Sequence, residues 1–220
     1  MDRIFLINVL FLFSFKIFAQ ENAVREVKNP PVVFEILPGT SGYAAQMTVN
    51  KTLRDFPKFG FFSVTNFSSK WRETYSRDMM NQIHLTYQFA KGLKILVGTH
   101  YTPNSGLRPN TAVSYTYSSR TLMFSLMPRI DLSKNSNWEG FAMLEYKPQL
   151  NQHWNIYTRV QGLYCATVKN RDHARSYLML RAGLSYKDFR FGLGVNWDAY
   201  GPEKTSKENY GIFIASNVFN

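Results

Sequence analysis

The sequence contains only one cysteine, Cys165, among its 220 residues. No intrachain disulfide can form, so the fold must be stable without covalent cross-links. The four histidines are then the main candidates for metal ligands, and they are too far apart in sequence to show ligand spacing. We therefore predict no metal site and no cofactor, and we expect Cys165 to pack as a small, inert side chain.

Acidic residues are also scarce, since 15 Asp and Glu stand against 26 Lys and Arg and give a net charge of +11. A strongly basic chain raises nucleic acid as a partner. Here, however, the basic residues are spread over predicted turns and loops and do not gather along one helix or stripe. We therefore expect no nucleic-acid partner.

Long apolar runs are missing except at the start of the chain. Residues 4–15 are apolar and of signal-peptide length, they follow a weakly basic opening, and Ala19 fits the last residue before cleavage. A transmembrane anchor would need about 20 apolar residues, and Lys16 interrupts this run too early. The sequence predicts a cleaved signal peptide at residues 1–19, export, and a single domain at residues 20–220.

The remainder of the chain shows a repeated alternation of apolar and polar side chains. In one stretch Ile83, Leu85 and Tyr87 share one face, whereas His84 and Thr86 share the other. Successive side chains of a strand point to opposite faces, so this period of two predicts β-strands. Similar stretches predict strands at 31–36, 41–51, 58–68, 81–90, 93–101, 111–119, 121–130, 138–147, 153–166, 176–186, 189–198 and 208–219.

The strand count depends on the first of these stretches, in which prolines restrict the strand to an edge or a start. Without it there are eleven strands, and with it twelve. Tight turns are predicted at 90–92, 118–120 and 186–188, and longer polar loops at 69–80, 102–110, 131–137, 167–174 and 200–208. If the tight turns share one rim, both chain ends reach that rim only with twelve strands, which we therefore predict.

Alternation alone does not say which face meets water. In a secreted soluble β-barrel that binds a ligand, the polar strand face would meet solvent and carry many Lys, Glu and Asp. Here that face carries mostly Gln, Thr, Ser, Asn and Gly, and aromatic residues gather at strand ends, as they do at membrane interfaces. We predict an all-β fold, a closed antiparallel transmembrane β-barrel with its apolar face outside, and keep the soluble barrel as an alternative.

The chain resembles bacterial outer-membrane β-barrel proteins. The resemblance rests on the predicted export signal, the alternating strands, the alternation of short and long connections, and the ending "NYGIFIASNVFN". Its Tyr- and Asn-rich composition is similar to envelope proteins of Bacteroidota. The resemblance implies residence in the outer membrane among its lipids and lipopolysaccharide, and recognition of the last strand by the barrel-assembly machinery. Members commonly end on an aromatic residue, whereas here Phe219 is followed by Asn220.

Basic loop residues of an exported barrel either contact the phosphates of lipopolysaccharide or simply keep the loops solvated, and both interpretations stay open. The candidates for lipopolysaccharide contact are Arg108, Lys134, Lys169 and Arg171.

Charged residues on the polar strand faces are the candidate functional residues of the lumen. By strand parity they are Lys94, Arg129, Glu145, Arg159, Arg181, Arg190 and Asp198. They form either a basic constriction that favours anionic solutes, or a network of ion pairs and amides that holds a narrow barrel shut. The sequence thus predicts a non-enzymatic barrel that passes small solutes or serves as a structural subunit of an envelope complex with protein partners.

A lipid-modifying hydrolase of the outer membrane is the first alternative function. Such enzymes resemble serine hydrolases and pair a histidine with a serine two residues away on one strand. Neither His84-Leu85-Thr86 nor His100-Tyr101-Thr102 supplies the serine. Only His100 as base and Ser105 as nucleophile would remain to carry this activity.

Overall fold

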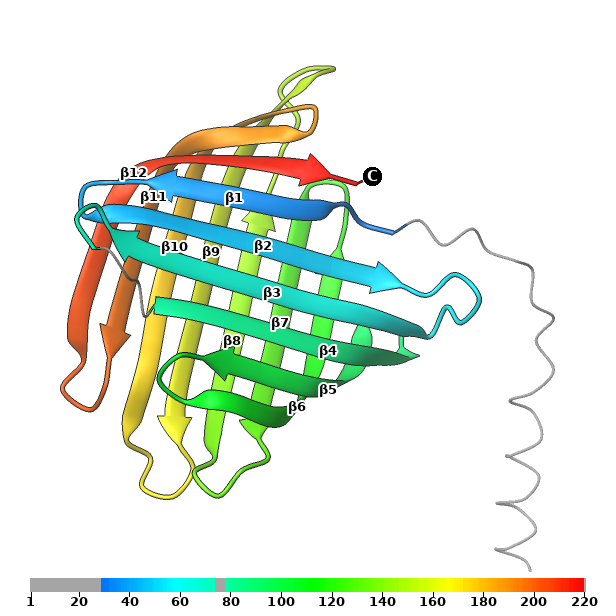
Figure 1. Cartoon of the computed structure of the whole chain (residues 1–220). Helices are drawn as coiled ribbons and strands as arrows, with labels where there is room; N and C mark the ends of the chain where they lie inside the picture. The colour runs from blue at the N-terminus through cyan, green and yellow to red at the C-terminus, as the bar shows by residue number, and fades with distance from the viewer. Residues whose placement is uncertain (1–28, 74–77, 220) are drawn as a thin grey trace, which may run out of the picture.

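The computed structural model describes residues 29–73 and 78–219, which form twelve antiparallel strands closed into one barrel (Figure 1). Each strand pairs with its neighbours in sequence, and β12 pairs with β1 to complete the cylinder. The strands are β1 (Val32–Pro38), β2 (Gly42–Thr52), β3 (Phe59–Lys70), β4 (Asp78–Ala90), β5 (Leu93–Thr102), β6 (Gly106–Ser118), β7 (Leu122–Asp131), β8 (Asn137–Tyr146), β9 (Trp154–Thr167), β10 (His173–Tyr186), β11 (Phe189–Tyr200) and β12 (Thr205–Val218). The predicted closed, twelve-stranded barrel is confirmed.

Within residues 29–73 and 78–219, no helix is long and apolar enough to cross a membrane. The predicted signal peptide at residues 1–19 lies outside the described residues.

Strand β1 is short because prolines bound it. Pro30 and Pro31 precede its first residue and Pro38 ends it, and a proline has no N–H to donate to a ladder. The residues between them still pair on both sides, from Val33↔Thr48 of β2 to Val32↔Val218 of β12. The proline-flanked segment therefore closes the barrel.

The alternation seen in the sequence corresponds to the inside and outside of the barrel. In β4, Gln82, His84 and Thr86 are buried in the lumen. Their neighbours Ile83 and Leu85 point outward and are 43% and 73% exposed. The same outward exposure of large apolar side chains recurs around the barrel, so the outer surface is apolar and the lumen is predominantly polar.

The tight turns lie at the end of the barrel where β1 begins and β12 ends, here called the terminal rim. Its connections are residues 53–58, 91–92, 119–121, 147–153 and 187–188. In the second of these, Gly92 has a φ of 76°, a left-handed conformation that glycine adopts without strain. The predicted placement of the tight turns is confirmed.

The other end, here called the opposite rim, differs from the prediction in its loop lengths. Its connections are residues 39–41, 71–77, 103–105, 132–136, 168–172 and 201–204, which are shorter than predicted. The strands continue into the predicted loops: β12 already begins at Thr205 and pairs Lys207 with Asp198. Residues 205–208 are polar and exposed on both faces, so the ladder continues where the hydrophobic alternation that marks a strand has stopped.

Candidate functional site

The seven charged residues predicted to share the lumen all lie on inward-facing positions. Five of them are less than 9% exposed, and Lys94 and Asp198 are partly buried. The five are Arg129, Glu145, Arg159, Arg181 and Arg190. Charges buried in this way must be paired or hydrogen-bonded, because desolvation of an isolated charge is costly. Their partners therefore decide what the lumen can do.

One set of ion pairs crosses the middle of the lumen, and we call it the central tie. Glu35 of β1 accepts from Arg159 of β9 at 2.7 Å and from Arg181 of β10 at 2.9 Å, both through Oε1. All three side chains are at most 6% exposed. The guanidinium of Arg181 also donates to the backbone carbonyls of Leu180 and Val195. The tie holds the wall around β1 against the wall around β9 and β10.

A second set of ion pairs spans the lumen at the opposite rim, and we call it the rim tie. Asp78 of β4 accepts a hydrogen bond of 2.6 Å from the Tyr200 hydroxyl of β11. Arg175 of β10 pairs with Asp198 of β11 at 2.8 Å and lies 3.8 Å from Asp78. Lys207 of β12 also lies 3.8 Å from Asp78. The first residue of β4 is thus linked to three strands on the other side of the barrel.

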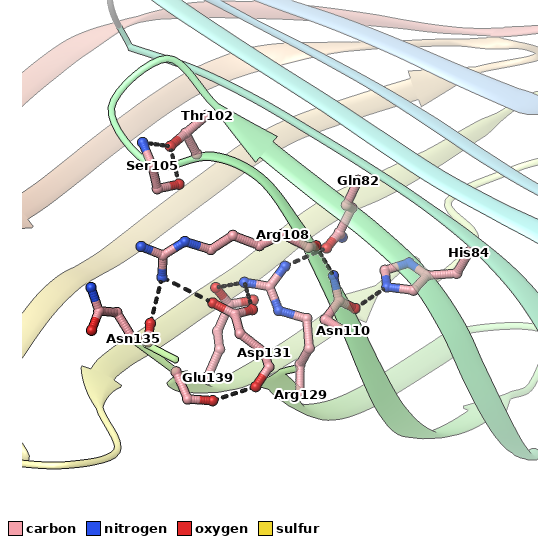
Figure 2. Close-up of polar contacts among 11 residues, drawn as sticks. Gln82, His84, Thr102, Ser105, Arg108, Asn110, Arg129, Asp131, Asn135 and Glu139 are labelled. Carbon is pink, nitrogen blue, oxygen red and sulfur yellow. Dashed lines mark hydrogen bonds and ion pairs between the residues drawn. The ribbon is translucent and has the colours of Figure 1, made fainter. Parts of the chain in front are cut away.

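A third set, here called the packed cluster, fills the lumen between β4 and β8 (Figure 2). Arg129 donates to Glu139 at 2.9 Å and to Gln82 at 3.4 Å. Arg108 pairs with Asp131 at 3.3 Å, and Asn110 bonds His84 at 2.6 Å. The members are Gln82, His84, Arg108, Asn110, Arg129, Asp131 and Glu139.

Apolar side chains fill the lumen beside the packed cluster. Leu96, Ala112 and Met127 are each at most 4% exposed and contact Phe62 and Phe141. These apolar side chains occupy the lumen between β3 and β8.

The lumen is also filled toward the terminal rim. The Tyr157 hydroxyl donates to Glu145 at 3.0 Å, and the Tyr157 ring lies 5.7 Å from the ring of Phe213. Arg190 stacks over Tyr157 at 5.5 Å and donates to Asn217 of β12. Tyr157 and Phe213 are fully buried.

Open volume remains on the side of the lumen formed by β1 to β4 and β10 to β12. A vestibule of about 260 Å³ opens at the opposite rim, between the β1–β2 turn and the start of β12. It continues into an inner cavity of about 30 Å³ beside Arg175, which ends at Glu35 and Arg181 of the central tie. Asp78 and Asp198 line both spaces. The lumen is thus a funnel that ends at the central tie.

The basic residues of the lumen do not form a ring of unpaired cations, because acidic residues pair with them. Four acidic residues that strand parity did not select pair with the basic ones: Glu35, Asp78, Asp131 and Glu139. Parity could have found two of them, because residues an even number of positions apart on a strand share a face. Asp131 follows Arg129 by two residues, and Glu139 precedes Glu145 by six. Glu35 lies in the proline-flanked segment and Asp78 in a predicted loop, so neither was assigned to the lumen.

The four predicted lipopolysaccharide contacts lie in two different settings. Lys134, Lys169 and Arg171 are exposed in the connections of the opposite rim. Arg108, predicted in a loop, instead belongs to β6; its side chain is 19% exposed and bonds Asp131 and the carbonyl of Asn135. The predicted loop at 102–110 is wrong here because β6 begins at Gly106.

The two residues of the alternative catalytic pair make no hydrogen bond to each other among the described contacts. His100 is buried in β5, whereas Ser105 lies in the β5–β6 turn and bonds the Thr102 hydroxyl at 2.7 Å (Figure 2). Cys165 is buried, with a free thiol.

No family model and no curated protein matches the sequence. Solved structures do match. The NanC porin is 14% identical, with 86% of this chain and 100% of that chain covered and a TM-score of 0.50. The KdgM porin is 12% identical (86% and 99% covered, TM-score 0.45), and OccAB4 of Acinetobacter baumannii is 10% identical (82% and 71%, TM-score 0.40). At the level of the fold, the chain is similar to bacterial outer-membrane porins, which confirms the predicted resemblance.

Proposed function

We propose that this protein is an integral β-barrel of the bacterial outer membrane that lets small solutes cross through its lumen. The observation that carries the proposal is the funnel. A polar vestibule of about 260 Å³ leads from the opposite rim into a lumen that is enclosed by an apolar outer wall. A soluble barrel would place the charged residues of its strands mainly outside, whereas here Arg129, Arg159 and Arg181 are buried in the lumen.

The proposed location in lipid follows from the outer surface. Outward side chains such as Leu85, Val97 and Leu193 are 73%, 57% and 71% exposed. In lipid every backbone polar group needs an internal partner, and a closed ladder supplies one. We propose that outer-membrane lipids surround this surface, and that the barrel-assembly machinery inserts the chain through β12.

Detergent extraction and gel migration test the location. The folded protein should require detergent for recovery from outer-membrane fractions, and heating should change its migration on a gel. A compact monomer that dissolves in buffer without detergent would contradict the proposal and support the secreted soluble barrel.

Conductance in planar lipid bilayers tests the transport itself. The inner cavity has a volume of only about 30 Å³, which is close to the volume of one water molecule in the liquid. We therefore expect small, brief channel openings that require movement of the central tie. A stable current as large as that of a wide pore would contradict the funnel, and a complete absence of current would contradict transport.

A structural barrel is the second candidate, and the central tie favours it. Glu35 of β1 contacts Arg159 of β9 and Arg181 of β10 at 2.7 and 2.9 Å, and these contacts link walls that are separated by three and two intervening strands. A barrel that never opens would serve an envelope complex through its rims, and it would give no current even when Glu35 is replaced.

The exposed cations of the opposite rim are proposed to contact the phosphates of lipopolysaccharide. Replacement of Lys134, Lys169 and Arg171 by alanine should weaken binding to vesicles that contain lipopolysaccharide and leave binding to neutral vesicles unchanged. Equal binding of both proteins to both vesicles would show that these residues only keep the loops solvated.

A further inference from the structure

The connections of the terminal rim share one kind of side chain, because each of the five contains a lysine or an arginine. In order along the chain these cations, here called the basic ring, are Arg54, Lys58, Lys91, Arg120, Lys147 and Lys187. Acidic residues occur in only two of the five connections, as Asp55 and Asp188. At the opposite rim, by contrast, the connections at residues 39–41 and 103–105 contain no charged residue. A continuous series of positive charges thus marks the terminal rim.

Most of the basic ring is accessible to a partner outside the chain. Lys147 is partly buried and pairs with Glu145. The other five cations are exposed, and none of them forms an ion pair in the part of the chain that the structure describes. Arg120 donates a hydrogen bond to Gln149, which is neutral and leaves the charge in place. The ring therefore attracts anions.

An exposed aromatic side chain accompanies each connection of the basic ring, within three residues of a cation. These side chains are 48–54% exposed on the outer surface, and they are Phe59, Phe89, Tyr117, Tyr146 and Phe189. Aromatic side chains of membrane barrels gather at the level of the lipid headgroups. In a bilayer, the basic ring would lie at the depth of the lipid phosphates.

The spacing of the basic ring fits many small anions better than one large anion. The connections join β2 to β3, β4 to β5, β6 to β7, β8 to β9 and β10 to β11, so neighbouring connections are two strands apart. Because adjacent strands are about 4.8 Å apart, neighbouring cations are on the order of 10 Å apart along the rim. A compact polyanion would reach only one or two of them, whereas each cation can meet the phosphate of a separate lipid.

We infer that the basic ring binds the headgroups of anionic phospholipids, such as phosphatidylglycerol, in the leaflet that surrounds the terminal rim. Lysine and arginine near a membrane surface are attracted to anionic lipid. Phosphatidylcholine attracts them less, because its own ammonium group neutralises its phosphate. This inference rests on the proposed location in the outer membrane, and it assigns a class of lipid to the rim that lies away from the cations proposed to contact lipopolysaccharide.

Trp154 provides a fluorescent reporter beside the basic ring. It begins β9, its ring lies 4.7 Å from the ring of Tyr186, and the ammonium of Lys187 lies 5.4 Å from the same Tyr186 ring. The other tryptophans of the four belong to the half of the barrel near the opposite rim, and they are Trp71, Trp138 and Trp197. Replacement of these three by phenylalanine in the full chain leaves Trp154 as the only tryptophan.

The first experiment measures quenching of Trp154 in equimolar vesicles of phosphatidylglycerol and phosphatidylcholine, with bromine on the acyl chains of one lipid at a time. We expect the relative binding constant to favour phosphatidylglycerol by at least about twofold, and to fall toward one in about 0.5 M salt, which screens the charges. Equal quenching by the two lipids at low salt would overturn the inference while leaving the location intact. No quenching by either lipid would overturn the location, and the inference with it.

Charge variants assign the preference to the basic ring. Arg120→Gln combined with Lys187→Gln removes two exposed cations near Trp154 and should lower the preference to about one. The matched control is Lys169→Gln combined with Lys204→Gln, which removes two exposed cations from the opposite rim. Lys204 and Lys187 both have a φ of 51° in a short hairpin connection, so the two variants are alike in backbone and in charge. A preference that survives the first variant, or falls equally in both, would overturn the assignment to the ring.

The unmodified chain gives a test that does not depend on the folding of any variant. The temperature at which the folded gel form is lost should be higher in equimolar vesicles of phosphatidylglycerol and phosphatidylcholine than in phosphatidylcholine alone, because lipid that binds the folded barrel stabilises it. The difference should disappear in about 0.5 M salt. An equal or lower temperature in the anionic vesicles at low salt would overturn the inference.

Discussion

Between β4 and β8 the lumen is filled by the packed cluster, whereas between β10 and β3 it contains the vestibule and the inner cavity. Both sides use arginines paired with carboxylates. On the packed side, the arginine–carboxylate pairs join neighbouring strands, as with Arg129 of β7 and Glu139 of β8. On the open side, partners such as Glu35 and Arg159 lie on walls that are separated by several strands. Ion pairs between neighbouring strands stiffen the wall of the barrel, whereas ion pairs across the lumen can break while the wall stays intact.

The largest effect is expected on the packed side. Arg129→Met leaves Glu139 buried without its cation, and removal of one partner of a buried pair costs about 3–5 kcal/mol. The free energy of unfolding by urea in lipid vesicles should fall by that amount. Arg129→Met combined with Glu139→Leu should recover most of the loss, because no charge is then left unpaired. A loss under about 1 kcal/mol in the single variant would show that the packed cluster is not rigid.

An intermediate effect is expected at the central tie. In Glu35→Gln the amide still accepts hydrogen bonds and Arg181 keeps its two backbone carbonyls, so we expect a loss of about 1–3 kcal/mol. The tie should open more often, and the mean current in planar bilayers should rise. Glu139→Gln is the matched control on the packed side, and it should destabilise the barrel without raising the current. A rise in both variants would remove the distinction between the two sides.

The smallest effect is expected at the rim tie. Tyr200→Phe removes a hydrogen bond of 2.6 Å to Asp78 and a longer one of 3.4 Å to Asp198. Because Arg175 and Lys207 remain close to the Asp78 carboxylate, we expect a loss of only about 1 kcal/mol. We expect a slightly higher rate of channel opening in single-channel records. The control is Tyr210→Phe, whose hydroxyl bonds Glu208 on the exposed surface. If this control changed the opening rate equally, the effect would not come from the lumen.

Strand parity accounts for what the sequence could predict. The period of two placed His84, Arg129 and Arg181 inside and Leu85 outside, because apolar side chains recur on the outward face of the strands. The even strand number followed from the position of the tight turns. These features depend on neighbours along the chain, and so a single sequence contains them.

Parity could not provide the partners across the lumen. Glu35 and Arg159 are 124 residues apart, and their contact depends on how far each strand is shifted against the next around the whole barrel. A register error of one residue turns a side chain to the other face. The full extent of β6 and β12 was hidden for another reason: polar residues cover both faces at the start of β12, and Gly106 and Pro109 interrupt the alternation at the start of β6. Arg108 was placed in a loop for that reason.

Strand β1 closes this barrel through contacts between residues that are far apart in the chain. It forms the seam with the far end of the chain, through pairs such as Val32↔Val218, and these pairs close the longest loop in the molecule, which is the slowest kind of contact to form. The same seven residues bring in Glu35, so the carboxylate that neutralises Arg159 and Arg181 arrives with the last edge of the wall. Before β1 pairs with β12, Arg159 and Arg181 lack the Glu35 carboxylate and repel each other. Once formed, the seam is stabilised by the backbone pairing of β1 with β12 and by the ion pairs of Glu35 inside the lumen.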